Sequence, residues 1–160
     1  MIREIDKKDI AECVNVIRES FKTVADEFGF TEENASRFTA FATTEGRLVW
    51  HLDVEHRPMY VYYDNDKIVG YYSLLLQENS ECEMNNLCVL PEYRHKGIGE
   101  ELLKSAFKVA KELNCVKMNI GIVEENHVLR KWYERYGFIH TGTKKFEFFP
   151  FTCGYMDKKL

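Results

Sequence analysis

The stretch VLPEYRHKGIGEELL, residues 89–103, joins an apolar run to a helix-forming run through a basic turn that holds two glycines. A helix that begins here leaves its first backbone N–H groups without partners, and these groups point toward any bound anion. Gly97 and Gly99 carry no Cβ, so a phosphate group can approach the main chain closely. Arg94 and Lys96 add positive charge. The stretch therefore predicts a site for a phosphate or pyrophosphate group.

Two common nucleotide-binding loops do not match this turn. The mononucleotide P-loop, GxxxxGK[ST], is absent, and the dinucleotide fingerprint GxGxxG has Leu102 in place of its third glycine. An isolated RxxGxG also occurs in surface turns that bind nothing. The turn by itself therefore leaves two interpretations open, an anion site and a basic surface turn.

Hydrophobic patterning along the rest of the chain predicts strands and helices. The predicted strands cover residues 1–5, both arms of a hairpin over 58–79, 81–90, 115–123, 139–149 and 151–160. The predicted helices start after Asp6, at residue 31 (ending near 44), at 98 and at 124, and Gly137 ends the last. Residues 45–57 have no readable pattern. Antiparallel hairpins with one strand–helix–strand crossover predict a single α+β, or mixed α/β, domain over residues 1–160.

Composition narrows the classes of function. The chain has 160 residues, of which 45% are hydrophobic and 30% charged, as in a soluble globular domain. Its net charge of -4 argues against nucleic-acid binding through bulk electrostatics. The charged N-terminus and the lack of a long apolar run argue against a signal peptide and against membrane insertion. Five cysteines without CxxC spacing predict reduced thiols in a cytoplasmic protein and no metal site. Monomer and homodimer both stay open.

A second motif, NHVLRKWYERYGF over residues 126–138, follows downstream. An Asn opens the predicted helix, a Tyr stands seven residues later, and Gly-Phe closes it. With Val89-Leu90-Pro91 and the turn from Arg94 to Gly99, this motif resembles the GNAT superfamily of acyl-CoA-dependent N-acyltransferases. The resemblance covers most of the chain, with residues 22–57 matching only in outline. It implies a mostly antiparallel mixed sheet of about six or seven strands, flanked by about four helices.

The same resemblance implies where acetyl-CoA, as acyl donor, binds. The turn from Arg94 to Gly99 would hold the pyrophosphate, and the preceding strand would hydrogen-bond the pantetheine arm. Asn126 would contact the cofactor, and Arg130 would be a phosphate contact or a surface charge. The expected cofactor-binding residues are Leu87, Cys88, Val89, Arg94, His95, Lys96, Gly97, Ile98, Gly99, Asn126 and Arg130.

Two residues are expected to carry the chemistry. The resemblance places Tyr133 near the sulfur, where a phenol can donate a proton to the departing thiolate; the alternative is an aromatic side chain that packs the helix end. Glu83 is a candidate general base, or an exposed strand residue. Strand alternation puts Glu83, Asn85 and Leu87 on one face unless a bulge intervenes. The backbone N–H near Cys88 or Val89 is the expected oxyanion donor.

Cys88 has no base beside it in sequence, so a buried structural residue explains it better than a covalent acyl-enzyme. The reaction implied is direct transfer of an acetyl group to a primary amine in a ternary complex.

The acceptor amine is not determined by the sequence. Its pocket would be lined by the first two helices, their connection and the last hairpin, where Glu45, Asp53 and Glu55 could attract a cation. Two other functions stay open. The chain could be a regulatory or interaction domain that binds CoA without turnover, or a protein that binds another phosphate ligand, such as a nucleotide.

Overall fold

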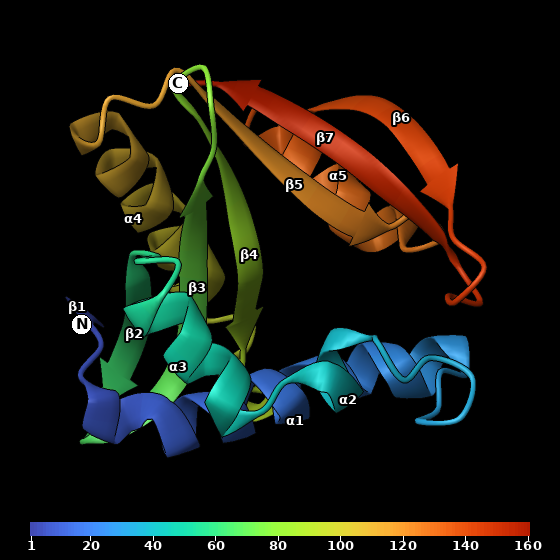
Figure 1. Cartoon of the computed structure of the whole chain (residues 1–160), viewed down its shortest axis with the longest axis horizontal. Helices are drawn as coiled ribbons and strands as arrows, with labels where there is room; N and C mark the ends of the chain where they lie inside the picture. The colour runs from blue at the N-terminus through green and yellow to red at the C-terminus, as the bar shows by residue number, and fades with distance from the viewer.

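The computed structural model describes all 160 residues and contains one seven-stranded sheet in the order β1-β2-β3-β4-β5-β7-β6 (Figure 1). The strands are β1 (Ile2–Glu4), β2 (Met59–Asp64), β3 (Lys67–Leu76), β4 (Glu81–Val89), β5 (Lys117–Val123), β6 (Ile139–Lys145) and β7 (Thr152–Lys159). All neighbours are antiparallel except β4 and β5, which are parallel and joined through α4 (Ile98–Glu112). The predicted fold class, a mostly antiparallel mixed sheet, is confirmed.

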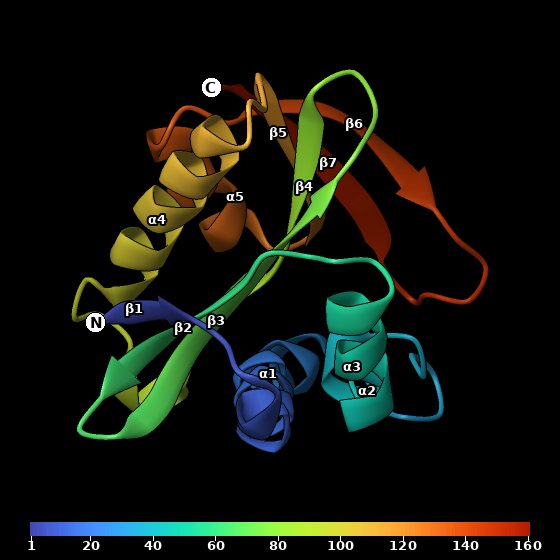
Figure 2. The same ribbon diagram turned by 60° about the vertical axis from the view of Figure 1, so that its left-hand side comes forward.

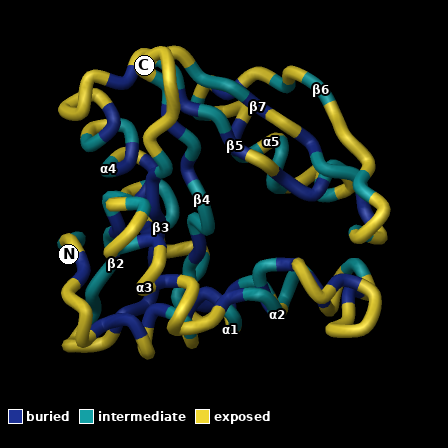
Figure 3. The backbone as a smooth tube through the Cα atoms, in the orientation of Figure 1, coloured by how far each residue is buried: buried dark blue, intermediate teal, exposed yellow.

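Helices cover both faces of this sheet (Figures 1 and 2). One face carries α1 (Ile10–Phe28), α2 (Thr39–Ala42) and α3 (Glu45–Asp53), and the other carries α4 and α5 (His127–Arg135). The short 3-10 turns η1 (Lys7–Asp9) and η2 (Pro91–Tyr93) precede α1 and α4. α4 crosses β3 closely, because a Cβ added to Gly70 would lie 2.7 Å from Leu102 Cδ1. A cluster of 29 buried residues fills both sides of β3 (Figure 3).

The predicted helix over residues 31–44 is wrong. Only the four residues of α2 are helical there, and turns occupy most of the remainder. Asn34 Oδ1 accepts from the backbone N–H of Thr31 (2.7 Å), and Thr31 Oγ1 accepts from the N–H of Asn34 (3.1 Å). Such local side-chain bonds compete with helical ones. Phe38 is instead buried in a second cluster, where it packs 5.8 Å from the Phe151 ring.

The unreadable segment 45–57 holds α3, a fifth helix beyond the four expected. Thr44 is its N-cap, since Thr44 Oγ1 accepts from the backbone N–H of Arg47 (3.2 Å). The cap and the buried Leu48 are the signals that sequence reasoning missed. No helix of the chain has the length and apolar character needed to cross a membrane. All five cysteines are free, and four of them are buried.

The parallel pair β4–β5 opens into a fork. Pairing is confined to Glu81–Lys117, Cys82–Met118 and Glu83–Asn119. Beyond these residues β4 continues beside β3, whereas β5 turns away beside β7 (Figure 1). The second half of β4 therefore has an edge without a neighbouring strand.

Candidate active site

The free edge of β4 presents the backbone of Val89. The N–H of Leu90 donates to Val69 O (2.8 Å), so alternation turns the peptide groups of Val89 away from β3 and toward the fork. Val89 O already accepts from Arg94 Nε (3.0 Å). The N–H of Val89 is therefore the better of the two expected oxyanion donors, since that of Cys88 faces β3.

A β-bulge in β4 decides which side chains share a face. Asn85 pairs with Ser73 but Cys88 pairs with Tyr71, and Asn86 within the bulge has a φ of 57°. The register therefore shifts by one residue. Glu83, Asn85 and Cys88 share the face of α1 to α3, and the bulge, the stated exception to strand alternation, removes Leu87 from this face.

The turn before α4 presents unpaired backbone donors. Gly97, with a φ of 83°, is the N-cap, and the first helical bond runs from the N–H of Glu101 to Gly97 O (3.1 Å). The N–H groups of Ile98, Gly99 and Glu100 have no intrahelical acceptor. A Cβ on Gly99 would lie 3.7 Å from Trp132 and 3.9 Å from Val89, whereas a Cβ on Gly97 would meet nothing within 4 Å, so space remains above the start of this turn.

The side chains of the turn differ in what they can offer a ligand. His95 and Lys96 are exposed, and Lys96 Nζ lies 5.2 Å from the ring centroid of Tyr93. Ile98 is buried in the core, so only its backbone is available. The predicted anion site thus consists of main-chain donors with Lys96 at its rim.

Arg94 has a different place from the one expected. Its guanidinium donates to Val89 O, to Thr23 Oγ1 (3.0 Å) and to the backbone O of Ser20 (2.9 Å). Burial lowers the pKa of Arg94 below its ordinary value. Each of its three nitrogens donates to a protein acceptor, so Arg94 ties the turn to α1, and two of its five N–H donors have no protein partner.

Glu83 stands at the base of the fork and lines a polar cavity of about 260 Å³. Asn85 Nδ2 donates to Glu83 Oε1, and Arg57 Nη1 donates to Asn85 Oδ1 (2.9 Å). Arg57 Nη2 in turn donates to Glu55 Oε1 (3.2 Å). This chain of bonds orients the Glu83 carboxylate toward the cavity wall formed by α2 and α3. Sequence reasoning missed Arg57, which lies outside both motifs.

Tyr133 is buried on α5 and adjoins β4. Its ring packs against Trp132 (5.1 Å between centroids) and Phe138 (5.3 Å). Burial, with a smaller effect from the Cys88 thiol, raises the pKa of Tyr133 well above its ordinary value. The phenol therefore stays protonated at neutral pH and can only donate. Burial likewise raises the pKa of Cys88 to about 12, which disfavours a nucleophilic thiolate there.

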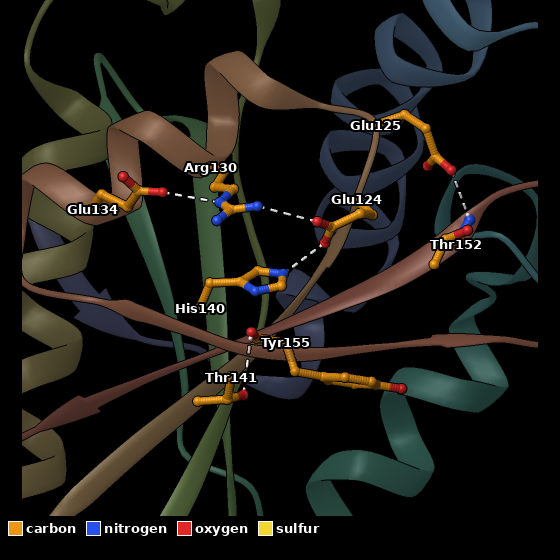
Figure 4. Close-up of polar contacts among 8 residues, drawn as sticks. All are labelled: Glu124, Glu125, Arg130, Glu134, His140, Thr141, Thr152 and Tyr155. Atoms are coloured by element: carbon orange, nitrogen blue, oxygen red, sulfur yellow. Dashed lines mark hydrogen bonds and ion pairs between the residues drawn. The ribbon is translucent and has the colours of Figure 1, made fainter.

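Asn126 and Arg130 have partners within the chain. Asn126 caps α5, since its Oδ1 accepts from the third helical N–H (3.2 Å). Arg130 donates to Glu134 (2.9 Å) and to Glu124 (3.1 Å), and Glu124 also contacts His140 Nε2 at 2.8 Å (Figure 4). Arg130 is therefore paired with two carboxylates, as in the surface-charge alternative, and the Nδ2 group of Asn126 has no partner within the chain and is available to a ligand.

The cavity beside Glu83 also contains a neutral histidine. His51 is 6% exposed, and burial, aided by Arg57, lowers its pKa to about 4 from 6.5. Its Nδ1 has no hydrogen-bond partner. Two further arginines, Arg37 and Arg47, line the same cavity. The acidic residues expected there, Glu45, Asp53 and Glu55, do not line it.

His51 is expected to make stability depend on pH. The unfolded chain takes up a proton below pH 6.5, but folded His51 does so only near pH 4, so stability falls as the pH drops through this window. Between pH 7 and pH 4.5 this linkage amounts to about 2 kcal/mol. Denaturant unfolding at pH 7 and pH 4.5 should show that His51→Gln loses less stability than the wild type by this amount. The exposed His127→Gln is the control, and equal losses in His51→Gln and wild type would contradict the prediction.

The comparisons with known proteins agree with this geometry. The model of the acetyltransferase (GNAT) family matches residues 18–138. An uncharacterised N-acetyltransferase of Archaeoglobus fulgidus is 27% identical over 142 residues, covering 82% of this chain and 88% of that protein. Thialysine N-epsilon-acetyltransferase of Bos taurus is 24% identical over 143 residues, covering 86% and 82%. The crystal structure of the PaiA N-acetyltransferase of Thermoplasma acidophilum, in complex with coenzyme A, has a TM-score of 0.86 at 22% identity and covers 100% of this chain and 98% of that one.

Proposed function

Because the chain belongs to the GNAT family of acetyltransferases, we propose that it transfers an acetyl group from acetyl-CoA to a primary amine by direct attack in a ternary complex. The observation that carries the proposal is the fork between β4 and β5. This fork brings together a free backbone edge, the unpaired donors of the turn before α4, the carboxylate of Glu83 and the protonated Tyr133.

The binding of acetyl-CoA is supported by the fit of its parts to this chain. The N–H groups of Ile98, Gly99 and Glu100 suit the pyrophosphate, with Lys96 at the rim. The free edge of β4 beyond Glu83 suits the pantetheine amides, which can bind to a strand edge as a further strand does. Arg94 acts as a positioning residue that holds this turn against α1.

The proposed reaction moves three protons, two of them through side chains. Glu83, directly or through a water, takes a proton from the ammonium form of the acceptor, because only the free amine is a nucleophile. The amine nitrogen then bonds to the thioester carbonyl carbon, and the N–H of Val89 stabilises the oxyanion. As the carbonyl forms again and the C–S bond breaks, Tyr133 donates its proton to the thiolate sulfur. The attacking nitrogen, which is cationic after bond formation, loses its surplus proton to solvent, and Tyr133 regains a proton from solvent. The products are the acetylated amine and free CoA.

The first experiment separates the proposed function from its alternatives. We expect acetyl-CoA and CoA to raise the unfolding temperature of the protein, and a panel of amines to accelerate the release of free thiol from acetyl-CoA. Stabilisation by CoA without amine-dependent thiol release would favour a non-catalytic CoA-binding domain. Stabilisation by ATP but not by CoA would overturn both the acetyltransferase and the CoA-binding domain.

A further inference from the structure

We propose that the acceptor is a small amine that also carries an anionic group, a carboxylate or a phosphonate, and that Arg37 and Arg47 bind this group. The proposal rests on the proposed function, and it names the substrate class of the same site. It starts from the charges that line the cavity beside Glu83.

The positive charges in this cavity exceed the negative ones. Glu83 is the only carboxylate that lines it, whereas Arg37, Arg47 and Arg57 all do. Arg57 is balanced by Glu55, to which its Nη2 donates at 3.2 Å. Neither Arg37 nor Arg47 forms an ion pair with any carboxylate of the chain. Two guanidinium groups are therefore left without a counter-ion beside a site that must receive a substrate.

Arg37 is held at the rim by an aromatic contact. Its Cζ lies 4.2 Å from the ring centroid of Phe148, and this ring packs against Phe146 (5.1 Å) and Phe149 (4.8 Å). A guanidinium held over the face of a ring makes this contact through its charge, so its N–H donors stay free for an anion. Arg37 is thus positioned without being neutralised.

The cavity therefore carries both a carboxylate and unpaired guanidinium groups. Glu83 comes from β4 at the fork, where the acetyl group would lie, and Arg37 and Arg47 come from the segments that begin α2 and α3. His51, which also lines the cavity, is neutral above about pH 5, since burial holds its pKa near 4, and its unpaired Nδ1 can bond a polar group. A substrate with an amine beside Glu83 and an acid group beside the two arginines would pair with both kinds of charge. The volume of about 260 Å³ suits a molecule of amino-acid size.

The test uses pairs of acceptors that differ only in the acid group. Each amino carboxylate and aminophosphonate is compared with the alkylamine of equal chain length, whose amine has similar basicity. We expect kcat/KM to be at least about 10-fold higher for the acid-bearing member, and Arg47→Gln or Arg37→Gln to raise its KM about 10-fold. The alkylamine carries no acid group for these arginines to bind, so the same variants should not raise its KM. Arg135→Gln, an exposed arginine on α5, is the matched control. The carboxylate and phosphonate arms identify which acid group is preferred.

Direct binding keeps this test separate from that of the proposed function. Calorimetric titration of the same pairs into the CoA-saturated protein should show selective binding of the acid-bearing members, lost in Arg47→Gln. Selective binding without thiol release would support the charged pocket and overturn the proposed transfer. Thiol release that is equal for both members of each pair, or that is faster with polyamines or peptide amines, would overturn this inference and leave the transfer standing.

Discussion

Replacing Tyr133 with phenylalanine is expected to lower kcat for acetyl transfer about 100-fold or more, with the KM for acetyl-CoA unchanged. The expectation follows from the state of the phenol. Burial raises the pKa of Tyr133, so the proton needed by the departing thiolate stays on this hydroxyl throughout the neutral range. Phenylalanine keeps the ring contacts with Trp132 and Phe138 but carries no proton to give. Steady-state thiol release with an active amine is the measurement.

The pH profile and a matched variant make this result specific. Because the pKa of Tyr133 is raised, any loss of wild-type activity below about pH 10 must come from another group. Tyr60→Phe is the control, since Tyr60 is a half-buried tyrosine stacked on Tyr72 in β2 and β3, away from the fork. A kcat for Tyr133→Phe within about twofold of wild type, with an unchanged unfolding temperature, would reduce Tyr133 to a packing residue.

Local patterns in the sequence predicted most of the fold. The hairpin predicted over 58–79 is present as β2 and β3, which are joined through Asn65 and Asp66, both with positive φ. The helix predicted to start at residue 98 is present as α4. These elements depend on residues close together in the chain. The helix predicted over residues 31–44 was wrong because Phe38 packs against Phe151. This contact joins distant residues, and no local pattern reveals it.

In the candidate site, the backbone features could be predicted from the sequence, whereas the partners of the side chains could not. The anion-binding turn depends on the start of a helix and on two glycines, so the sequence could predict it. Two partners of Arg94, Thr23 and Ser20, lie 71 and 74 residues away on α1. A guanidinium binds whichever acceptor the fold brings nearest, and this cannot be read from neighbouring letters. For the same reason, the sequence did not predict that Arg37 and Arg47 line the acceptor cavity.

Glu83→Gln is expected to lower kcat/KM about 100-fold at pH 7, because the amide cannot accept the ammonium proton. The hydrogen bond from Asn85 can persist to the amide oxygen, so the local structure is retained. The dependence on pH identifies the role. As the pH rises toward the pKa of the acceptor amine, solvent removes the proton instead, and the deficit of the variant should shrink.

The matched control for Glu83 lies two residues earlier in the same strand. Glu81 pairs with Lys117 (3.0 Å) where β4 and β5 are still joined, so Glu81→Gln changes the same chemical group outside the fork and should keep full activity. A deficit in Glu83→Gln that stays constant from pH 7 to pH 10 would mean that Glu83 binds the acceptor and takes no proton from it. Unchanged activity in both variants would leave Glu83 an exposed strand residue. A deficit that closes with pH in Glu83→Gln alone is the result that only a general base at the fork explains.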